Sequence, residues 1–373
     1  MMGTRLTEEE RQCLFWLSRI SGFGPIFTER VWSGIKQKTS LYNIEEKVLV
    51  EKKLIPPALA ERFKAAQGAE RRRQAESEYE ELGKRKIRFL TPYDEDYPEA
   101  LSHIANRPMG LYIKGKLPEP EQPVAAIVGA RECSGYGRQI AQYFGRELSA
   151  NGIQIVSGLA AGIDSAGNRG AVEAGKATFG VLGCGINICY PKENYELYEI
   201  MEQTGGIISE YGLGEPPRAG NFPMRNRIIS GMADVILVIE AREKSGSLIT
   251  TEIALEQGKD IFAVPGRITD LLSAGCNRLI QGGAYPLLEP NDVLDFFGIR
   301  SKKVLRIQEK NEKGLAKEEK KVYSCLDLQP KFIEEIVDES GLPVHECMGV
   351  LLDLELKGYI VQEANHYYRK NCG

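Results

Sequence analysis

The sequence predicts an α/β protein with a doubly wound parallel sheet, a small helical domain before it and a small helix-turn-helix domain after it. From residue 124 to about residue 298, apolar runs with the composition of strands alternate with segments compatible with helices. These runs are apolar throughout instead of at every second position, as in strands that helices cover on both faces of a parallel sheet.

Composition excludes several classes of protein. No apolar run approaches the roughly 20 residues of a membrane span, and the amino terminus lacks the apolar segment of a signal peptide. We therefore expect no membrane span and a cytoplasmic location. A net charge of -4 argues against a surface that attracts nucleic acid everywhere, so any site for an anion has to be local.

Cofactors and metals find no support in the sequence. The eight cysteines form no CxxC pair, and none of the three histidines lies near a cysteine cluster, so we expect free thiols and no metal. The segment "GARECSGYG" has Arg131 where the dinucleotide fingerprint needs a glycine beside the pyrophosphate. A complete Walker loop is also missing, and neither NAD nor ATP is expected.

The chain divides into four segments. Residues 1–68 read as short helices, the first opened by Thr7 and Glu10 at the spacing of a capping box. The break "SGFGP" at 21–25 is either a plain helix turn or a hairpin that grips a DNA backbone. Residues 69–298 hold a charged helix and the sheet, and residues 299–321 form a charged linker.

Residues 322–373 follow the order of a winged helix: helix, turn, helix and two short strands. The second helix carries Glu346, Asp353 and Glu355 instead of a basic stripe. Contact with a protein and contact with DNA both remain open for this domain.

Six strands are expected in the sheet, and ligands of such sheets bind beyond the carboxyl ends of the strands. The runs are "VAAIVG" (124–129), "IQIVSG" (153–158), "ATFGVLG" (177–183), "GGIISEY" (205–211), "ADVILVIEA" (233–241) and "DIFAVPG" (260–266).

Three loops at these strand ends place a cation beside the expected amino end of a helix: Arg131, Arg225 with Arg227, and Lys244. The helix dipole makes a cation at this end unfavourable. A bound anion would make the arrangement favourable, because it interacts well with both the cation and the dipole. Hydroxyls such as those of Ser134 and Ser247 would add donors for a phosphate.

Two alternatives accompany the anion interpretation. Each arginine could instead pair with a carboxylate, such as Asp164, Glu210 or Glu240. Asp164 and Glu252 could also act as acid or base, as in hydrolases of nucleotide glycosidic bonds. The structural alternative is that Asp164 caps a helix and Glu252 lies on an ordinary helix face.

Separate cations suit the successive phosphates of a nucleic-acid strand better than one compact triphosphate. Phe222 and Tyr136 would then offer faces on which exposed bases stack. No histidine lies between residues 124 and 298, so a Ser-His or Cys-His pair cannot form within this domain.

Six ordered motifs resemble the DNA-processing protein A family (DprA, also called Smf): "VGAR…SGYG", "SGLAAGIDSAGNRGA", "VLGCGINICYPKEN", "SEYGLGEPPRAGNFPMRNRIISG", "SGSLITTEIALEQGKDIFAVPG" and "GCNRLIQGGA". The resemblance covers nearly the whole chain. It implies an extended Rossmann-like domain, binding of single-stranded DNA without strong sequence preference, a homodimer, and loading of the RecA recombinase during natural transformation. No catalysis and no cofactor are implied.

The resemblance and the cationic loops together give the expected site. The DNA-binding residues are Arg131, Ser134, Ser157, Gly158, Phe222, Arg225, Asn226, Arg227, Lys244 and Ser247. The dimer contact is expected in the segment 277–284, with Asn277, Leu279 and Ile280.

The sequence departs from the family pattern at three positions, where Ala130 replaces a common serine, Ala161 an arginine and Asn168 a histidine. Losing the arginine puts in question how much the loop before Asp164 contributes to binding.

Two rival functions remain. The "SGSLITTE" loop resembles the Gly-Gly-x-Gly-Thr-x-x-Glu loop of nucleoside-monophosphate phosphoribohydrolases, with Glu252 as the acidic residue. Alternatively, the winged helix recruits partners and the chain serves as an adaptor.

Overall fold

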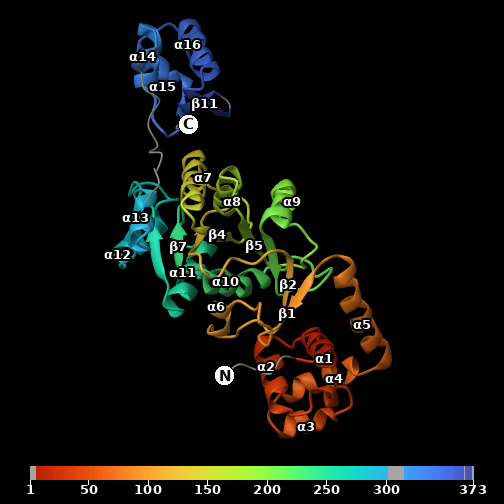
Figure 1. Ribbon diagram of the computed structural model, residues 1–373. Helices are drawn as coiled ribbons and strands as arrows, with labels where there is room; N and C mark the ends of the chain where they lie inside the picture. The colour runs from red at the N-terminus through yellow and green to blue at the C-terminus, as the bar shows by residue number, and fades with distance from the viewer. Residues whose placement is uncertain (1–5, 301–314, 365, 372–373) are drawn as a thin grey trace.

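The computed structural model describes residues 6–300, 315–364 and 366–371. Figure 1 shows a helical domain at one end, a sheet covered by helices in the centre and a small α/β domain that ends the chain. The predicted fold class, a mostly parallel doubly wound sheet with a helical start and a winged-helix end, is confirmed.

The helical domain folds around buried aromatic side chains, among them Trp16, Trp32 and Phe63. Thr7 caps the first helix as expected, because its hydroxyl accepts the Glu10 N–H and the Glu10 carboxylate accepts the Thr7 N–H. The helices are α1 (Glu8–Ser18), α2 (Pro25–Gly34), η1 (Lys38–Tyr42), α3 (Glu46–Glu51), α4 (Pro57–Ala66) and α5 (Ala69–Lys84).

All six expected strands form, and they run parallel in the order β6-β5-β4-β3-β7-β8. Two further strands extend the sheet antiparallel beyond β6, and a short one extends it parallel beyond β8. The strands are β1 (Arg88–Leu90), β2 (Leu111–Gly115), β3 (Val124–Val128), β4 (Gln154–Ser157), β5 (Thr178–Leu182), β6 (Gly206–Ser209), β7 (Val235–Val238), β8 (Asp260–Ala263) and β9 (Tyr285–Pro286).

Helices cover both faces of the sheet, which explains the unbroken apolar strands. Along β3, Ala125 and Ile127 pack under one set of helices, and Ala126 and Val128 pack against the other. Figure 1 shows α7, α8 and α9 above the sheet and α10 and α11 below it. These helices are α7 (Gly135–Ala150), α8 (Ile163–Glu173), α9 (Tyr195–Thr204), α10 (Asn221–Met232) and α11 (Gly246–Glu256). Shorter elements are α6 (Glu99–Ser102), η2 (Lys192–Asn194), α12 (Ala274–Gln281) and α13 (Pro290–Phe296).

Glycines let α7 and α8 approach each other closely. A Cβ on Gly170 would lie 2.0 Å from the Gln142 carbonyl oxygen, and one on Gly145 would lie 2.1 Å from that of Gly167. Backbone therefore packs on backbone between these two helices. This contact sets the spacing between α7, which follows β3, and α8, which follows β4.

The final domain has the expected order of helix, turn, helix and two strands, preceded by one more helix and a short strand. Its elements are α14 (Lys317–Ser324), β10 (Lys331–Phe332), α15 (Ile333–Ser340), α16 (Val344–Leu356), β11 (Ile360–Ala364) and β12 (Tyr367–Lys370). The helix α14 begins within the segment 299–321 that the sequence marks as a linker. Most of that segment lies outside the described residues.

Across the described ranges, no helix combines the length and the apolar character needed to cross a bilayer.

We expect Gly170→Ala to lower stability by about 1 to 3 kcal/mol, because the methyl group forces α7 and α8 apart. Gly83→Ala is the matched control: Gly83 lies in the exposed part of α5 with nothing within 4 Å of an added Cβ. That change should be neutral or should stabilise by about 0.5 to 1 kcal/mol. Thermal unfolding of both variants measures the difference, and equal midpoints would contradict the close packing.

Candidate nucleic-acid interface

The strand order reverses at β3, which lies between β4 and β7. The chain leaves β3 for α7 on one face of the sheet and leaves β7 for α11 on the other. Connections that depart to opposite faces leave a crevice at the carboxyl ends of the two strands, the usual ligand position in doubly wound sheets.

A cavity of about 740 Å³ occupies this crevice. It is bounded by the loop after β3, the start of α10 and the loop after β7. Six of the ten predicted DNA-binding residues line it: Arg131, Phe222, Arg225, Asn226, Lys244 and Ser247. The topology therefore brings the three predicted cationic loops to one place.

Arg225 is the buried centre of the site, with 4 % of its surface exposed. Its Nη1 donates to the carbonyl oxygen of Gly158, at 2.7 Å, and to that of Val181. These carbonyls belong to the ends of β4 and β5, so the guanidinium ties α10 to both strands. Burial lowers the pKa of Arg225 to about 10, and the nearby charge of Asp164 opposes that shift.

Asp164 faces the same point from α8 and accepts the Gly158 N–H at 2.9 Å. Burial raises the pKa of this carboxyl, while the Arg225 charge and backbone N–H groups pull it down. A Cβ at position 158 would lie 2.5 Å from Arg225 Nη2 and 2.7 Å from Asp164 Oδ2. Gly158 thus makes room for both groups, and it also lines a small adjacent cavity of about 120 Å³.

Arg227 points away from the cavity, although it lies only half a turn after Arg225. It makes a bidentate pair with Glu210 at 2.8 and 2.7 Å, and its Nε donates to the Asn106 carbonyl oxygen at 3.0 Å. Burial raises the pKa of Glu210, and Arg227 opposes the shift. For this arginine, the carboxylate alternative describes the structure.

Two predicted hydroxyls are engaged inside the protein. Ser134 caps α7 by accepting the Gly137 N–H, and its own hydroxyl donates to Glu240. Ser157 is fully buried and donates to Asn168, whose amide reaches Thr178. Neither hydroxyl lines the cavity, so both hold the scaffold in place.

The exposed side chains around Phe222 complete the site. The Arg131 guanidinium carbon lies 5.2 Å from the centroid of the Phe222 ring, and the Tyr190 ring lies 5.7 Å from it. Arg242 and Lys244 approach from the loop after β7, and both are exposed. Arg242 and Tyr190 were not among the predicted site residues, although Tyr190 stands in the motif "VLGCGINICYPKEN" and Arg242 lies two residues before Lys244.

Other candidate residues lie elsewhere. Glu252 is exposed on α11 and does not line the cavity, and neither does Tyr136. Of the departures from the family pattern, Asn168 is fully buried, and Ala161 lines the small adjacent cavity.

The expected dimer residues lie on or beside α12. Asn277 exchanges hydrogen bonds with the backbone of Gly266, and Leu279 and Ile280 pack partly buried against the sheet core. The exposed apolar side chains near them are Ile268 and Leu271, at 93 % and 71 % exposure.

The fold and the crevice define a Rossmann-like protein with a cation-lined cavity at its topological switch point. Residues 88–298 match the family described as DNA recombination-mediator protein A, and residues 308–366 match the DprA winged helix domain. The chain therefore belongs to the DNA recombination-mediator protein A family.

Similar proteins agree with this assignment. The DNA processing protein DprA of Streptococcus pneumoniae is 44 % identical over 204 residues, 55 % of this chain and 72 % of that protein. Protein Smf of Escherichia coli is 34 % identical over 287 residues, 75 % and 77 % of the two chains.

Two solved structures are similar. The X-ray structure of DprA from Streptococcus pneumoniae has a TM-score of 0.67 at 35 % identity and covers 78 % of this chain and 98 % of that one. A Helicobacter pylori DNA processing protein A, whose structure concerns its single-stranded DNA binding mode, has a TM-score of 0.52 at 29 % identity, covering 57 % and 95 %.

Buried, paired arginines such as Arg227 and exposed arginines such as Arg131 should differ in their effect on stability. We expect Arg227→Ala to cost about 3 to 5 kcal/mol, because it leaves the Glu210 carboxylate largely buried without its partner. Arg131→Ala should leave the unfolding midpoint unchanged, since that side chain is exposed. Chemical denaturation followed by circular dichroism measures both, and an unchanged Arg227→Ala variant would contradict the structural role.

Proposed function

We propose that the cavity binds single-stranded DNA through its phosphates and bases. One observation carries the proposal: Arg131, Arg242 and Lys244 line the same cavity as the Phe222 ring, and within the described ranges none of these three cations has an ion-pair partner. Separate cations in a cavity that also holds an aromatic face match the alternation of phosphate and base along a single strand.

The chemistry of the lining favours binding without sequence preference. Bases stack on aromatic faces whatever their identity, and Phe222 and Tyr190 form a pair of such faces. The exposed cations recognise phosphates, which are the same at every nucleotide. Duplex DNA keeps its bases stacked inside the helix, so the single strand is the better ligand.

Family membership extends the proposal to the biology. The resemblance implies loading of RecA onto the bound strand and a role in natural transformation, and the composition predicts a cytoplasmic location. The proposed role is non-catalytic. The hydrolase alternative is less well supported because its acidic residue, Glu252, is exposed on α11 outside the cavity lining.

A second candidate role concerns the winged helix. Along α16, Val344, Met348, Leu352 and Leu356 recur every four residues and are all exposed. Side chains at this spacing share one face of a helix. An apolar face among acidic residues favours a protein partner for this domain over DNA, in keeping with an adaptor role that accompanies DNA binding.

The DNA proposal is tested by removing two exposed cations. Fluorescence anisotropy should show that Arg131→Ala/Lys244→Ala binds a labelled oligothymidylate at least about tenfold more weakly than wild type. The log-log salt slope should become shallower by about 1.4, or about 0.7 for each lost phosphate contact.

The matched control is Lys116→Ala/Lys176→Ala. It removes the same charge from exposed lysines beside the amino ends of β6 and β5, at the opposite edge of the sheet. If the control weakens DNA binding equally, binding depends on net charge alone and not on the cavity. If the wild-type protein binds no single-stranded DNA, the proposal is wrong.

We also propose that the chain is a homodimer that buries the apolar surface beside α12. Ile268 and Leu271 are too exposed to contribute to the protein's own core, and they adjoin the expected segment 277–284.

Light scattering after gel filtration should therefore show a dimer for wild type and a monomer for Ile268→Glu/Leu271→Glu. A control with other exposed apolar residues, Val344→Glu/Leu352→Glu on α16, each 57 % exposed, should remain dimeric. A monomeric wild type, or a dimer that survives the first pair of changes, would contradict this interface.

A further inference from the structure

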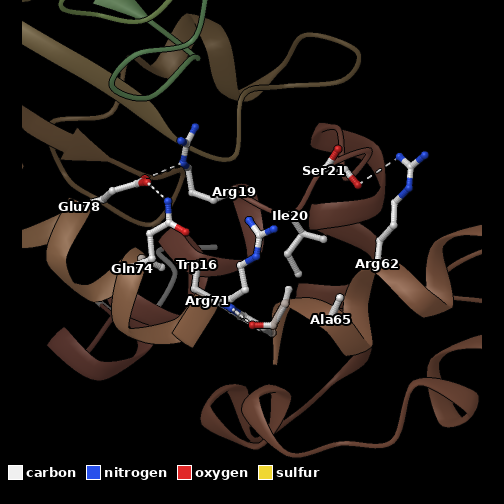
Figure 2. Close-up of a pocket in the computed structure, with 11 residues that line it drawn as sticks. Trp16, Arg19, Ile20, Ser21, Arg62, Ala65, Arg71, Gln74 and Glu78 are labelled. Carbon is white, nitrogen blue, oxygen red and sulfur yellow. Dashed lines mark hydrogen bonds and ion pairs between the residues drawn. The ribbon is translucent and has the colours of Figure 1, made fainter. Parts of the chain in front are cut away.

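A second cation-lined cavity lies in the helical domain, far along the chain from the first. Figure 2 shows it between the end of α1, α4 and α5. It measures about 290 Å³, and Arg19, Arg62 and Arg71 all line it, whereas Glu78 is its single carboxylate. The lining therefore carries an excess of positive charge in a domain that the site at the sheet does not use.

The three guanidinium groups are incompletely paired. Arg19 donates to Glu78 at 3.1 Å, and Gln74 reaches the same carboxylate. Arg62 makes only a long contact, 3.4 Å, with the Ser21 carbonyl oxygen. Arg71 has no hydrogen-bond or ion-pair partner among the residues that the structure describes. Guanidinium groups in this state present several donors at once, as recognition of a phosphate requires.

The break "SGFGP" forms part of this cavity's rim. Gly22 has a φ of +85°, a conformation that favours glycine, and a Cβ there would lie 2.5 Å from Arg62 Nη1. The Arg62 guanidinium therefore lies against the turn.

A groove of about 480 Å³ leads from this cavity toward the sheet. It shares Arg19, Ile20 and Ser21 with the cavity and reaches Asn221 and Met224 at the start of α10. On the same helix, Phe222 and Arg225 line the crevice at the switch point. The first turn of α10 is therefore the ridge between the groove and that crevice.

The groove contains polar groups without partners. Tyr112, with 2 % of its surface exposed, lines the groove, and its hydroxyl has no hydrogen bond within the described part of the chain. The Asn221 side-chain amide nitrogen lacks a partner there as well. Buried polar groups left unpaired are costly, and a ligand with polar edges, such as a nucleobase, would satisfy them.

We propose that the single strand continues from the crevice across the first turn of α10 into this groove, with its phosphates held by Arg62 and Arg71 in the helical domain. The inference rests on the proposed function, because the groove extends the same path. Bases would meet Tyr112 and Asn221 in the groove, and the backbone would follow the cations beyond it.

The test compares oligonucleotides of two lengths. An oligothymidylate of about 6 nucleotides fills the crevice alone, and one of about 25 nucleotides also reaches the helical domain. The variant Arg62→Ala/Arg71→Ala should bind the long strand at least about fivefold more weakly, with a salt slope shallower by about 1.4, and should bind the short strand like wild type. Both side chains are exposed, so the variant should fold.

The matched control is Lys64→Ala/Arg73→Ala, which removes two exposed cations from the same two helices but leaves the cavity lining intact. It should bind both strands like wild type. The proposed extension is wrong if the two double variants behave alike, or if Arg62→Ala/Arg71→Ala weakens binding of both oligonucleotides equally. The proposal that the crevice binds DNA would be unaffected by either result. If wild type binds neither strand, the proposed function fails with it.

Tryptophan fluorescence gives a second readout without mutation. The chain has two tryptophans, Trp16 and Trp32, and both lie in the helical domain, where Trp16 lines the cavity. The long oligonucleotide should change the emission of the wild-type protein, and the short one should not. If the emission does not change when the long oligonucleotide saturates the protein, the proposed extension is wrong.

Discussion

The site depends on the burial of one guanidinium. Arg225 donates to carbonyl oxygens at the ends of β4 and β5 and lies near the Asp164 carboxylate, so it fastens the first turns of α10 to the carboxyl edge of the sheet. Phe222 stands one turn earlier on the same helix, and its ring gains its position from that attachment. Removing a buried charge that several groups surround disrupts the scaffold before it changes any ligand contact. Binding is therefore better tested through Arg131 and Lys244, which are exposed.

Much of the site was predictable because parallel topology leaves little freedom. Apolar strands separated by helices fix the sheet, and the loops after β3 and β7 then have to meet at the switch point. The sequence could not show which way each side chain faces on a helix that runs beside this edge. Arg225 and Arg227 are two residues apart, about 200° around α10, so one enters the site and the other meets Glu210.

The other differences between the predicted site and the structure have physical reasons as well. Ser134 and Ser157 look like phosphate donors in sequence, yet each has an internal acceptor that tertiary packing brings near, Glu240 and Asn168. Tyr190 reaches Phe222 from the loop after β5, and no local pattern marks that contact. A sequence can indicate which loops meet at the edge of a sheet. Which polar groups of those loops pair with each other depends on distances that only the folded structure sets.

The position of the carboxylates explains how a chain with a negative net charge can hold a site for an anion. The chain is acidic overall, at -4, and acidic residues stand close to every cationic loop. Glu210 is held by Arg227, Glu240 accepts from Ser134, and Asp164 accepts backbone N–H groups. The Glu240 carboxylate also lies near the amino end of α7, where a negative charge is favourable. Internal partners thus engage these three carboxylates, and the exposed charges in the cavity lining are then three cations, Arg131, Arg242 and Lys244, against one carboxylate, Glu132. Under the proposed function, the acidic total opposes a polyanion elsewhere on the protein, and the cation-lined cavities are where a strand would be held, which would restrict it to one path.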